Sequence, residues 1–166
     1  MLLGVEQVAL GVQDFQVGRG AAVIAQLGQF GPRGLGARHA DLDVELFGLG
    51  DPHIRYDSAE KMRAAIAELP NPEKTPPVRL GVVHAPYQHA LNSLLDAGAD
   101  VIFAGHTHGG QVRVPGIGAL TANCDLPVQQ ARGISVWYDA ERAAFLNVSA
   151  GLGASIYSPI RFACRP

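Results

Sequence analysis

Cysteine is scarce in this sequence, with Cys124 and Cys164 the only two among 166 residues. Two cysteines cannot build the disulfide framework of a small secreted protein. They also form no Cys-x-x-Cys pair of the kind that binds zinc. The scarcity favours a reduced, cytoplasmic protein, unless an N-terminal targeting segment has been lost.

Long apolar runs and an excess of charge are also missing. No stretch approaches the roughly 18 apolar residues of a membrane-spanning helix, so we expect no transmembrane segment. The formal net charge is −2 and charged residues make up 17% of the chain, which gives no electrostatic argument for nucleic-acid binding. The apolar content of 48% suffices for one globular domain with a real core.

Two histidines stand in a glycine-rich loop directly after a predicted strand. Residues 105–111 read Gly-His-Thr-His-Gly-Gly-Gln and follow the apolar run at 100–104. If the backbone is nearly extended there, His106 and His108 point the same way, because side-chain direction repeats every second residue. Neutral imidazole binds zinc, iron and similar ions. A solvated histidine pair without a ligand is the alternative.

A third histidine, His84, ends another apolar strand at 78–83. A helix after Pro86, with leucines on one face and Gly98 as its C-cap, connects this strand to the one at 100–104. The strand–helix–strand order predicts a parallel crossover. Open α/β sheets bind ligands beyond the carboxyl ends of their strands. We therefore predict that His84 shares one metal site with the histidine pair.

The remaining pattern predicts an α/β fold. A strand is expected at 44–47, and a helix that begins at Asp57 and Glu60 in a capping-box-like arrangement follows it. Past Gln111 the sequence is typical of short strands, expected at 112–114, 134–138, 145–148 and 160–163. Residues 1–43 form an unmatched lead-in rich in Gly, Gln and Ala, with a short helix expected at 21–30.

The motifs resemble a known family. Val-Val-His-Ala-Pro at 82–86, followed by the loop at 105–111, resembles the last two metal motifs of calcineurin-like metallophosphoesterases. Asn-Val-Ser-Ala-Gly-Leu-Gly at 147–153 and Ser-Pro-Ile-Arg-Phe at 158–162 are similar to the C-terminal signature of one bacterial branch. The resemblance covers residues 44–166.

The resemblance implies a layered α/β/β/α sandwich around two divalent metal ions of the manganese, iron or zinc type. His84 and His106 would bind one ion and His108 the other. The implied activity is hydrolysis of phosphomonoesters or phosphodiesters.

The chain also departs from the family pattern, because it contains no Gly-Asp-x-x-Asp and no Gly-Asn-His. By resemblance, these motifs supply the bridging carboxylate and the histidine near the leaving group. Asp51-Pro-His53 fits Asp-x-His but stands only about thirty residues before His84, so we interpret it as a loop near the pocket mouth. A plain turn with an exposed histidine is the alternative. We expect a truncated form with an incomplete N-terminal half.

Four residues are candidate substrate contacts: Asp51, His53, Asn123 and Arg161. Arg161 could hold a phosphate through a bidentate contact, although a structural salt bridge explains it equally well. Asn123 fits either a pocket wall or a turn. Asp51, Asp100 and Asp125 are weak substitutes for the missing carboxylate, and no catalytic residue is assigned.

The sequence thus indicates a metal-dependent hydrolase of phosphate esters. The alternative is a non-catalytic metal-binding or structural remnant of such an enzyme. The particular substrate, the metal and the oligomeric state remain open at this point.

Overall fold

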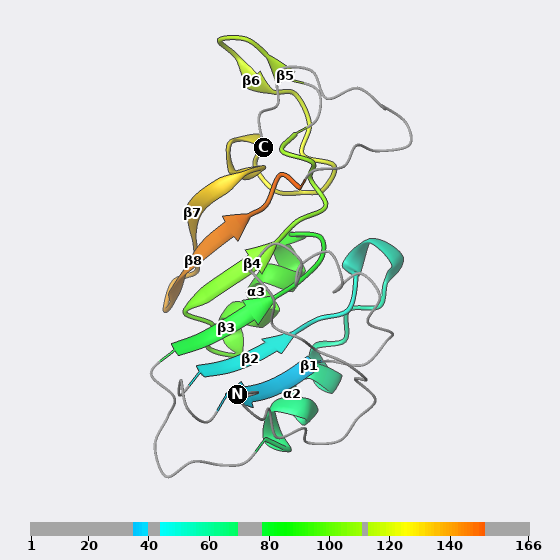
Figure 1. The fold of residues 1–166 in the computed structure, drawn as a ribbon, viewed down its shortest axis with the longest axis vertical. Coiled ribbons are helices and arrows are strands. Elements are labelled where there is room, and N and C mark those ends of the chain that lie inside the picture. The colour runs from blue at the N-terminus through cyan, green and yellow to red at the C-terminus, as the bar shows by residue number, and fades with distance from the viewer. Residues whose placement is uncertain (1–34, 40–43, 70–77, 111–112, 152–166) are drawn as a thin grey trace, which may run out of the picture.

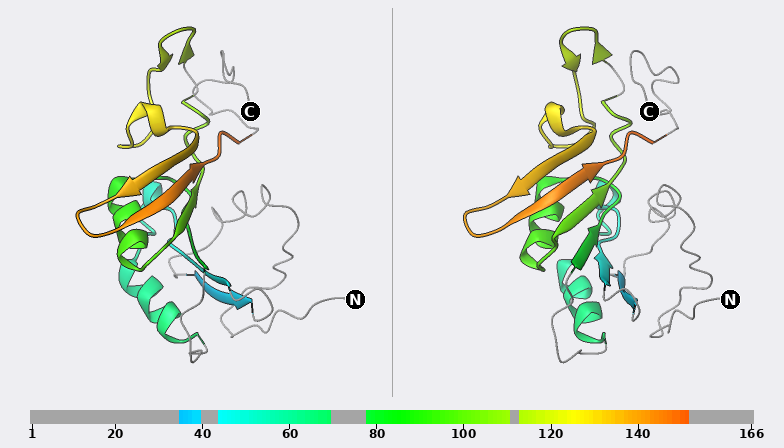
Figure 2. Two further views of the ribbon diagram at one scale, coloured as in Figure 1. Left: turned by 90° about the vertical axis from the view of Figure 1, so that its left-hand side faces the viewer. Right: turned by 60° about the vertical axis from the view of Figure 1, so that its left-hand side comes forward.

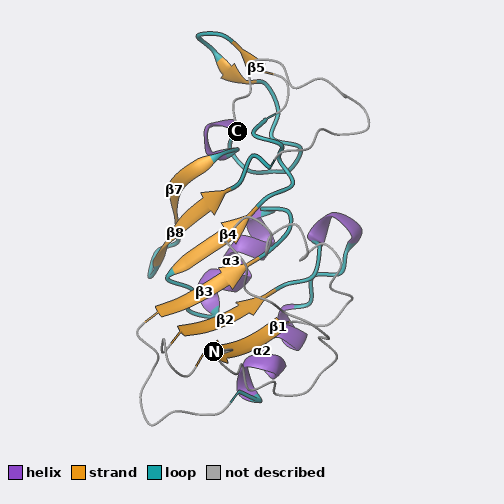
Figure 3. Ribbon diagram, viewed as in Figure 1, coloured by secondary structure: helices purple, strands orange, loops and turns teal. Residues whose placement is uncertain are grey.

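Six strands form one mixed sheet, in the order β1-β2-β3-β4-β8-β7 (Figures 1 and 3). The computed structural model describes residues 35–39, 44–69, 78–110 and 113–151. The inner strands run parallel to their neighbours, whereas both edge strands run antiparallel. The strands are β1 Leu35–His39, β2 Val44–Gly48, β3 Val78–Val82, β4 Val101–Ala104, β7 Gly133–Tyr138 and β8 Ala143–Val148. With its helices, this sheet places the chain in the α/β class.

Both described α-helices, α2 (Ala59–Ala67) and α3 (Gln88–Asp96), lie on the same side of the sheet (Figure 2). The N-cap of α2 is Ser58, whose hydroxyl accepts a hydrogen bond from the Lys61 amide at 3.3 Å. The expected start at Asp57 was therefore wrong by one residue, because the Asp57 carboxylate is engaged by His89. Neither helix is long and apolar enough to cross a lipid bilayer.

The core lies between these helices and the sheet. Helix α3 contributes an unbroken buried stripe, since Leu91, Leu94 and Leu95 recur at helical spacing. Gly81 lets α3 approach closely, because a Cβ at this position would stand 3.4 Å from the Leu94 Cβ. Burying each large apolar side chain contributes about 1.5–3 kcal/mol. The other large buried side chains are Phe47, Met62, Val83, Ile102, Leu146 and Val148.

The opposite face of the sheet carries exposed apolar side chains. Ile134 is 77% exposed, Tyr138 72% and Phe145 60%, and Val136 pairs with Phe145 across the ladder. Parallel sheets are normally covered on both faces. Within the described residues, both α-helices cover only the other face (Figure 2).

Most expected elements are present. The strands at 44–47, 78–83, 100–104, 134–138 and 145–148 and the helix after Pro86 are confirmed within one or two residues, and Gly98 follows that helix with φ +88°. Part of the strand expected at 112–114 is present as β5 (Arg113–Val114), which pairs with β6 (Gly118–Ala119). The sequence did not predict β1, which lies inside the unmatched lead-in. The helix expected at 21–30 and the strand expected at 160–163 lie outside the described residues.

Candidate functional site

The carboxyl ends of β2, β3 and β4 meet at one edge of the sheet and are followed by Asp51, His84 and His106 respectively. The loops after β3 and β4 stay paired beyond the strands, since the Gly105 amide donates to the His84 carbonyl at 2.9 Å. This pairing brings His84 Nε2 within 3.1 Å of His106 Nδ1. The two ring centroids are 5.0 Å apart, with the rings inclined by 70°.

The backbone of the histidine loop is not extended. His106 and His108 have φ values of +65° and +50°, and Gly109 and Gly110 are left-handed as well. We expected His106 and His108 to point the same way because side-chain direction repeats every second residue along an extended backbone. That reason was wrong, because the backbone here is left-handed. Left-handed backbone costs roughly 1–2 kcal/mol for an L residue, so surrounding contacts must impose this path.

Thr107 supplies those contacts. Its side chain is buried, and its hydroxyl donates to the Ala131 carbonyl at 2.7 Å while accepting from the Gly109 amide at 3.2 Å. The Gly110 amide donates to the Thr107 carbonyl at 3.0 Å. The loop is thus fixed between its two histidines.

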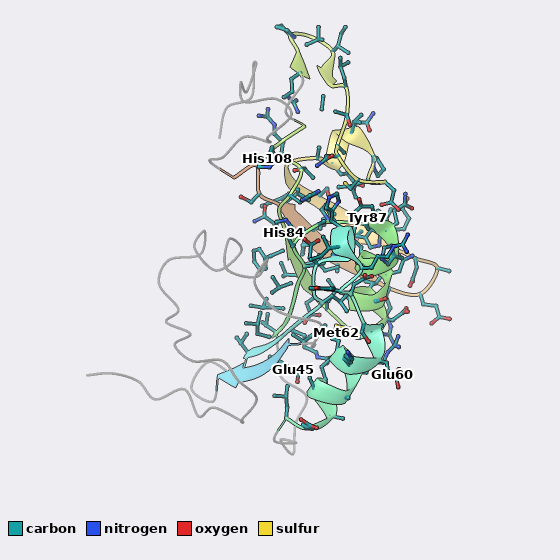
Figure 4. The ribbon with its side chains drawn as sticks, turned by 90° about the vertical axis from the view of Figure 1, so that its right-hand side faces the viewer. Glu45, Glu60, Met62, His84, Tyr87 and His108 are labelled. Atoms are coloured by element: carbon teal, nitrogen blue, oxygen red, sulfur yellow. The ribbon has the colours of Figure 1, made fainter. Side chains whose placement is uncertain are left out.

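In Figure 4, His84 lies near the middle of the molecule, with His108 above it and with Met62 and Glu45 below it. Burial is the main cause of the lowered pKa of His84 and His106, and a positive charge on His108 contributes least. Of the three histidines predicted to share a site, the structure thus brings His84 and His106 into contact.

The Asp-Pro-His segment enters the same region. Asp51 caps the 3-10 helix η1 (Pro52–Ile54), and its Oδ1 accepts from the His53 amide at 2.9 Å. The carboxylate is nearly buried, and Oδ2 lies 4.0 Å from His84 Nε2. The His53 ring is exposed, with its centroid 4.7 Å from that of His106. The segment is a turn with an exposed histidine, but the turn is part of the histidine cluster.

Tyr87 belongs to the cluster but was not predicted from the sequence. Its hydroxyl lies 3.3 Å from His53 Nδ1, and its backbone forms the N-cap of α3. Burial raises the pKa of the Tyr87 phenol, so the hydroxyl keeps its proton for hydrogen bonding. An aromatic residue after a proline is typical of an ordinary helix entrance, so no signal in the sequence marked this contact.

Asn123 also contacts the site, because its Nδ2 lies 3.1 Å from His106 Nε2. Asp125 positions this loop, since it accepts a hydrogen bond from the Gln88 amide at 2.8 Å. Asp100 instead accepts from the Arg79 amide at 2.7 Å, at the start of β4. Arg161 lies outside the described residues.

The hydrogen bonds assign the imidazole protons. Asn123 Nδ2 donates to His106 Nε2, so a neutral His106 carries its proton on Nδ1 and donates it to His84 Nε2. His84 then carries its own proton on Nδ1, which is buried without a hydrogen-bond partner among the described residues. An unpaired buried group of this kind costs about 1–3 kcal/mol.

Burial lowers the pKa of His106 to about 4, with smaller contributions from His84 and His53. Burial also lowers the pKa of His84, which the Asp51 carboxylate partly opposes. Both rings are therefore neutral at physiological pH. Neutral imidazole is the form that binds metal ions.

These pKa shifts predict a loss of stability in mild acid. An unfolded histidine titrates near pH 6.5, whereas folded His106 titrates at about 4. Between these values the unfolded chain binds more protons, so the free energy of unfolding should fall as pH drops from 7 towards 4. Urea titrations at several pH values, with a chelator present, would measure this slope. His106→Asn should flatten the slope, and an equally steep slope in that variant would contradict the assignment.

Metal binding would require some rearrangement of side chains. Within the described residues, no three His, Cys, Asp or Glu side chains are already arranged to hold an ion. His84 Nε2 and His106 Nδ1 share a hydrogen bond, so their lone pairs do not converge on one point. Their separation is nevertheless suitable, because nitrogens bound at about 2.0–2.1 Å to one ion stand roughly 3.0–3.4 Å apart. Binding through His106 Nδ1 would also require the His106 proton to move to Nε2, with Asn123 turning its Oδ1 towards that proton.

No protein-family model, curated protein or solved structure matches this chain. The functional argument therefore depends on the motifs and the geometry of the site.

Proposed function

We propose that this chain is a metal-dependent hydrolase of phosphate esters, or the metal-binding part of one. The observation that carries the proposal is the convergence of neutral His84 and His106 beyond the ends of neighbouring parallel strands. The tautomer assigned to His84, with its proton on Nδ1, supports it, since this tautomer leaves the lone pair of Nε2 for an ion. Divalent ions of the manganese, iron or zinc type suit this donor set.

Different residues of the chain would bind the metal ion and contact the phosphate group. A bound divalent ion would neutralise phosphate charge and lower the pKa of a coordinated water. His84, His106 and His108 would hold the metal, and Asn123 would orient the His106 ring. His53 is exposed beside His106 and steadied by Tyr87, so it is placed to contact a phosphate group.

We also propose that the complete fold is the layered α/β/β/α sandwich. The apolar side chains on the open face of the sheet support this proposal, because a second layer would bury them. Val78, Val136, Tyr138 and Phe145 would then become interior residues.

An assay with an activated phosphodiester and added Mn²⁺ tests the proposed function. We expect weak, Mn²⁺-dependent turnover that falls at least 100-fold in His106→Ala, because ligands of one centre act as a unit. His89→Gln is the matched control, since His89 is exposed on α3, is paired with Asp57 and is not one of the proposed metal ligands. Turnover that His106→Ala leaves unchanged would contradict the proposal.

A second measurement separates the enzyme from the non-catalytic alternative. Mn²⁺ binding without turnover would favour a metal-binding remnant. Neither binding nor turnover in the folded chain would exclude the metal-dependent function for this chain.

A further inference from the structure

The face of the sheet opposite the helices, the open face, is apolar from β2 to β7. Paired residues of neighbouring strands point to the same face. One row of such pairs crosses five strands and consists of Leu46, Leu80, Val101, Phe145 and Val136. The rows on either side add further large apolar side chains, namely Val44, Val78, Val82, Phe103, Ile134 and Tyr138. Within these five strands, none of the side chains that share the open face is charged.

The open face also accounts for most of the exposed apolar side chains. Of the nine large apolar residues that are exposed in the described part of the chain, five lie on this face, namely Val78, Ile134, Val136, Tyr138 and Phe145. Four of these five belong to β7 and β8, so they form one patch centred on the pair Val136 and Phe145. A contiguous apolar patch normally marks an interaction surface, whereas single exposed apolar residues do not.

The outer edge of β7 is closed to strand pairing near its centre. The Phe145 amide donates to the Asp100 carbonyl at 2.9 Å, on the side of β4. Its partner Val136 therefore turns its own carbonyl away from β8, towards the outer edge. There the carbonyl accepts a hydrogen bond from Gln130 Nε2 at 3.1 Å. Another strand cannot pair at this position, so association through the face is favoured over association through the edge.

We infer that the open face binds a second copy of this chain, sheet against sheet across a twofold axis. The inference rests on the proposed layered sandwich and identifies the source of its second layer. Each chain supplies one sheet with both described α-helices on one side (Figure 2). Two chains joined through their open faces therefore have the layer order α/β/β/α.

Two copies of this face are chemically compatible. A twofold axis brings a patch onto an identical patch, and a face without charge allows this without like-charge repulsion. The polar residue Asn147 lies on the open face, paired with Phe103 and Ile134. Its side-chain amide both donates and accepts hydrogen bonds. Two such amides related by the axis can therefore bond to each other.

The area of the open face suits a dimer of moderate affinity. Five strands about 4.8 Å apart and about five residues long, at roughly 3.3 Å per residue, cover about 400 Å² in projection. Two faces together remove about 800 Å² in projection, and more accessible surface than that, because side chains project from the pleat. A specific interface needs about 1,000 Å² at least. We therefore expect a dissociation constant in the micromolar range.

The experiment measures the mass of the chain in solution against its concentration by analytical ultracentrifugation. Phe145→Glu and Phe145→Lys each place a charge at the centre of the patch. The control Ile117→Glu places a charge on the exposed turn between β5 and β6. Each variant is run alone, and the two Phe145 variants are also mixed in equal amounts. Circular dichroism checks folding, and Tyr138→Glu, at the end of β7, probes the face again if a Phe145 variant does not fold.

We expect the wild-type chain and Ile117→Glu to dimerise alike. Each Phe145 variant alone should associate at least about 100-fold more weakly, because like charges would meet across the axis. Mixing Phe145→Glu with Phe145→Lys should restore association by about 10-fold or more, since opposite charges then face each other.

A wild-type chain that stays monomeric, or a dimer that Phe145→Glu and Tyr138→Glu leave unchanged, would overturn the inference. A monomer with Phe145 shielded from hydroxyl-radical labelling would assign the face to other residues of the same chain, and a monomer with Phe145 labelled would leave it to a different protein. None of these results bears on Mn²⁺-dependent turnover, so the proposed hydrolase is tested separately.

Discussion

Replacing Arg79 with methionine should lower the free energy of unfolding by about 3–5 kcal/mol. Arg79 donates from Nε to Glu45 Oε1 at 2.9 Å and from Nη2 to the same oxygen at 2.5 Å. Its third nitrogen, Nη1, donates to the carbonyl of Ala97, the C-cap residue of α3. The guanidinium carbon lies 5.0 Å from the centroid of the Phe47 ring. The Glu45 side chain is 8% exposed, so Arg79→Met would leave a buried charge without a partner. Urea unfolding at pH 7 measures the loss.

A double variant separates the charge from the packing. Glu45→Met combined with Arg79→Met removes both charges and leaves apolar side chains in their place. It should be more stable than Arg79→Met alone, because no unpaired carboxylate remains. If the double variant loses the sum of the two single losses, the ion pair is not the source of the effect.

Local patterns were sufficient to predict the elements nearest the histidines. The leucine stripe of α3 and the apolar strands on either side carry helical and strand signals of ordinary strength, and the structure confirms them. Strand β1 was missed because glycine and proline at 31–36 are typical of a turn region. Its antiparallel pairing with β2, the next strand along the chain, is not revealed by composition.

Less of the site than of the fold could be predicted from the sequence. Histidine spacing drew attention to His84 and His106, which the structure brings within 3.1 Å of each other. The turn that orients His106 depends on Thr107, whose hydroxyl donates to the carbonyl of Ala131, 24 positions later. Asp51 was set aside because its distance along the chain from His84 is short for the family pattern. The parallel pairing of β2 with β3 brings Asp51 and His84 together regardless of that distance.

Substituting alanine for Gly110 should cost roughly 2–5 kcal/mol, because two penalties combine. Gly110 has φ +66°, where an L residue costs about 1–2 kcal/mol. Its new Cβ would also stand 2.4 Å from the Ala119 Cβ and 2.9 Å from the Thr121 carbonyl oxygen. Overpacking of this kind typically costs about 1–3 kcal/mol. Urea unfolding of the variant measures the total.

Gly116→Ala is the matched control, since Gly116 has φ +80° but a Cβ at this position would have no atom within 4 Å. It should lose only the backbone penalty of about 1–2 kcal/mol. The difference between the variants then isolates the packing of Gly110 against Ala119. Because the Gly110 amide bonds the Thr107 carbonyl, displacement of Gly110 should also turn His106 and weaken Zn²⁺ binding in Gly110→Ala alone. Equal losses of stability and of zinc affinity in both variants would show that this close approach does not hold the histidine loop in place.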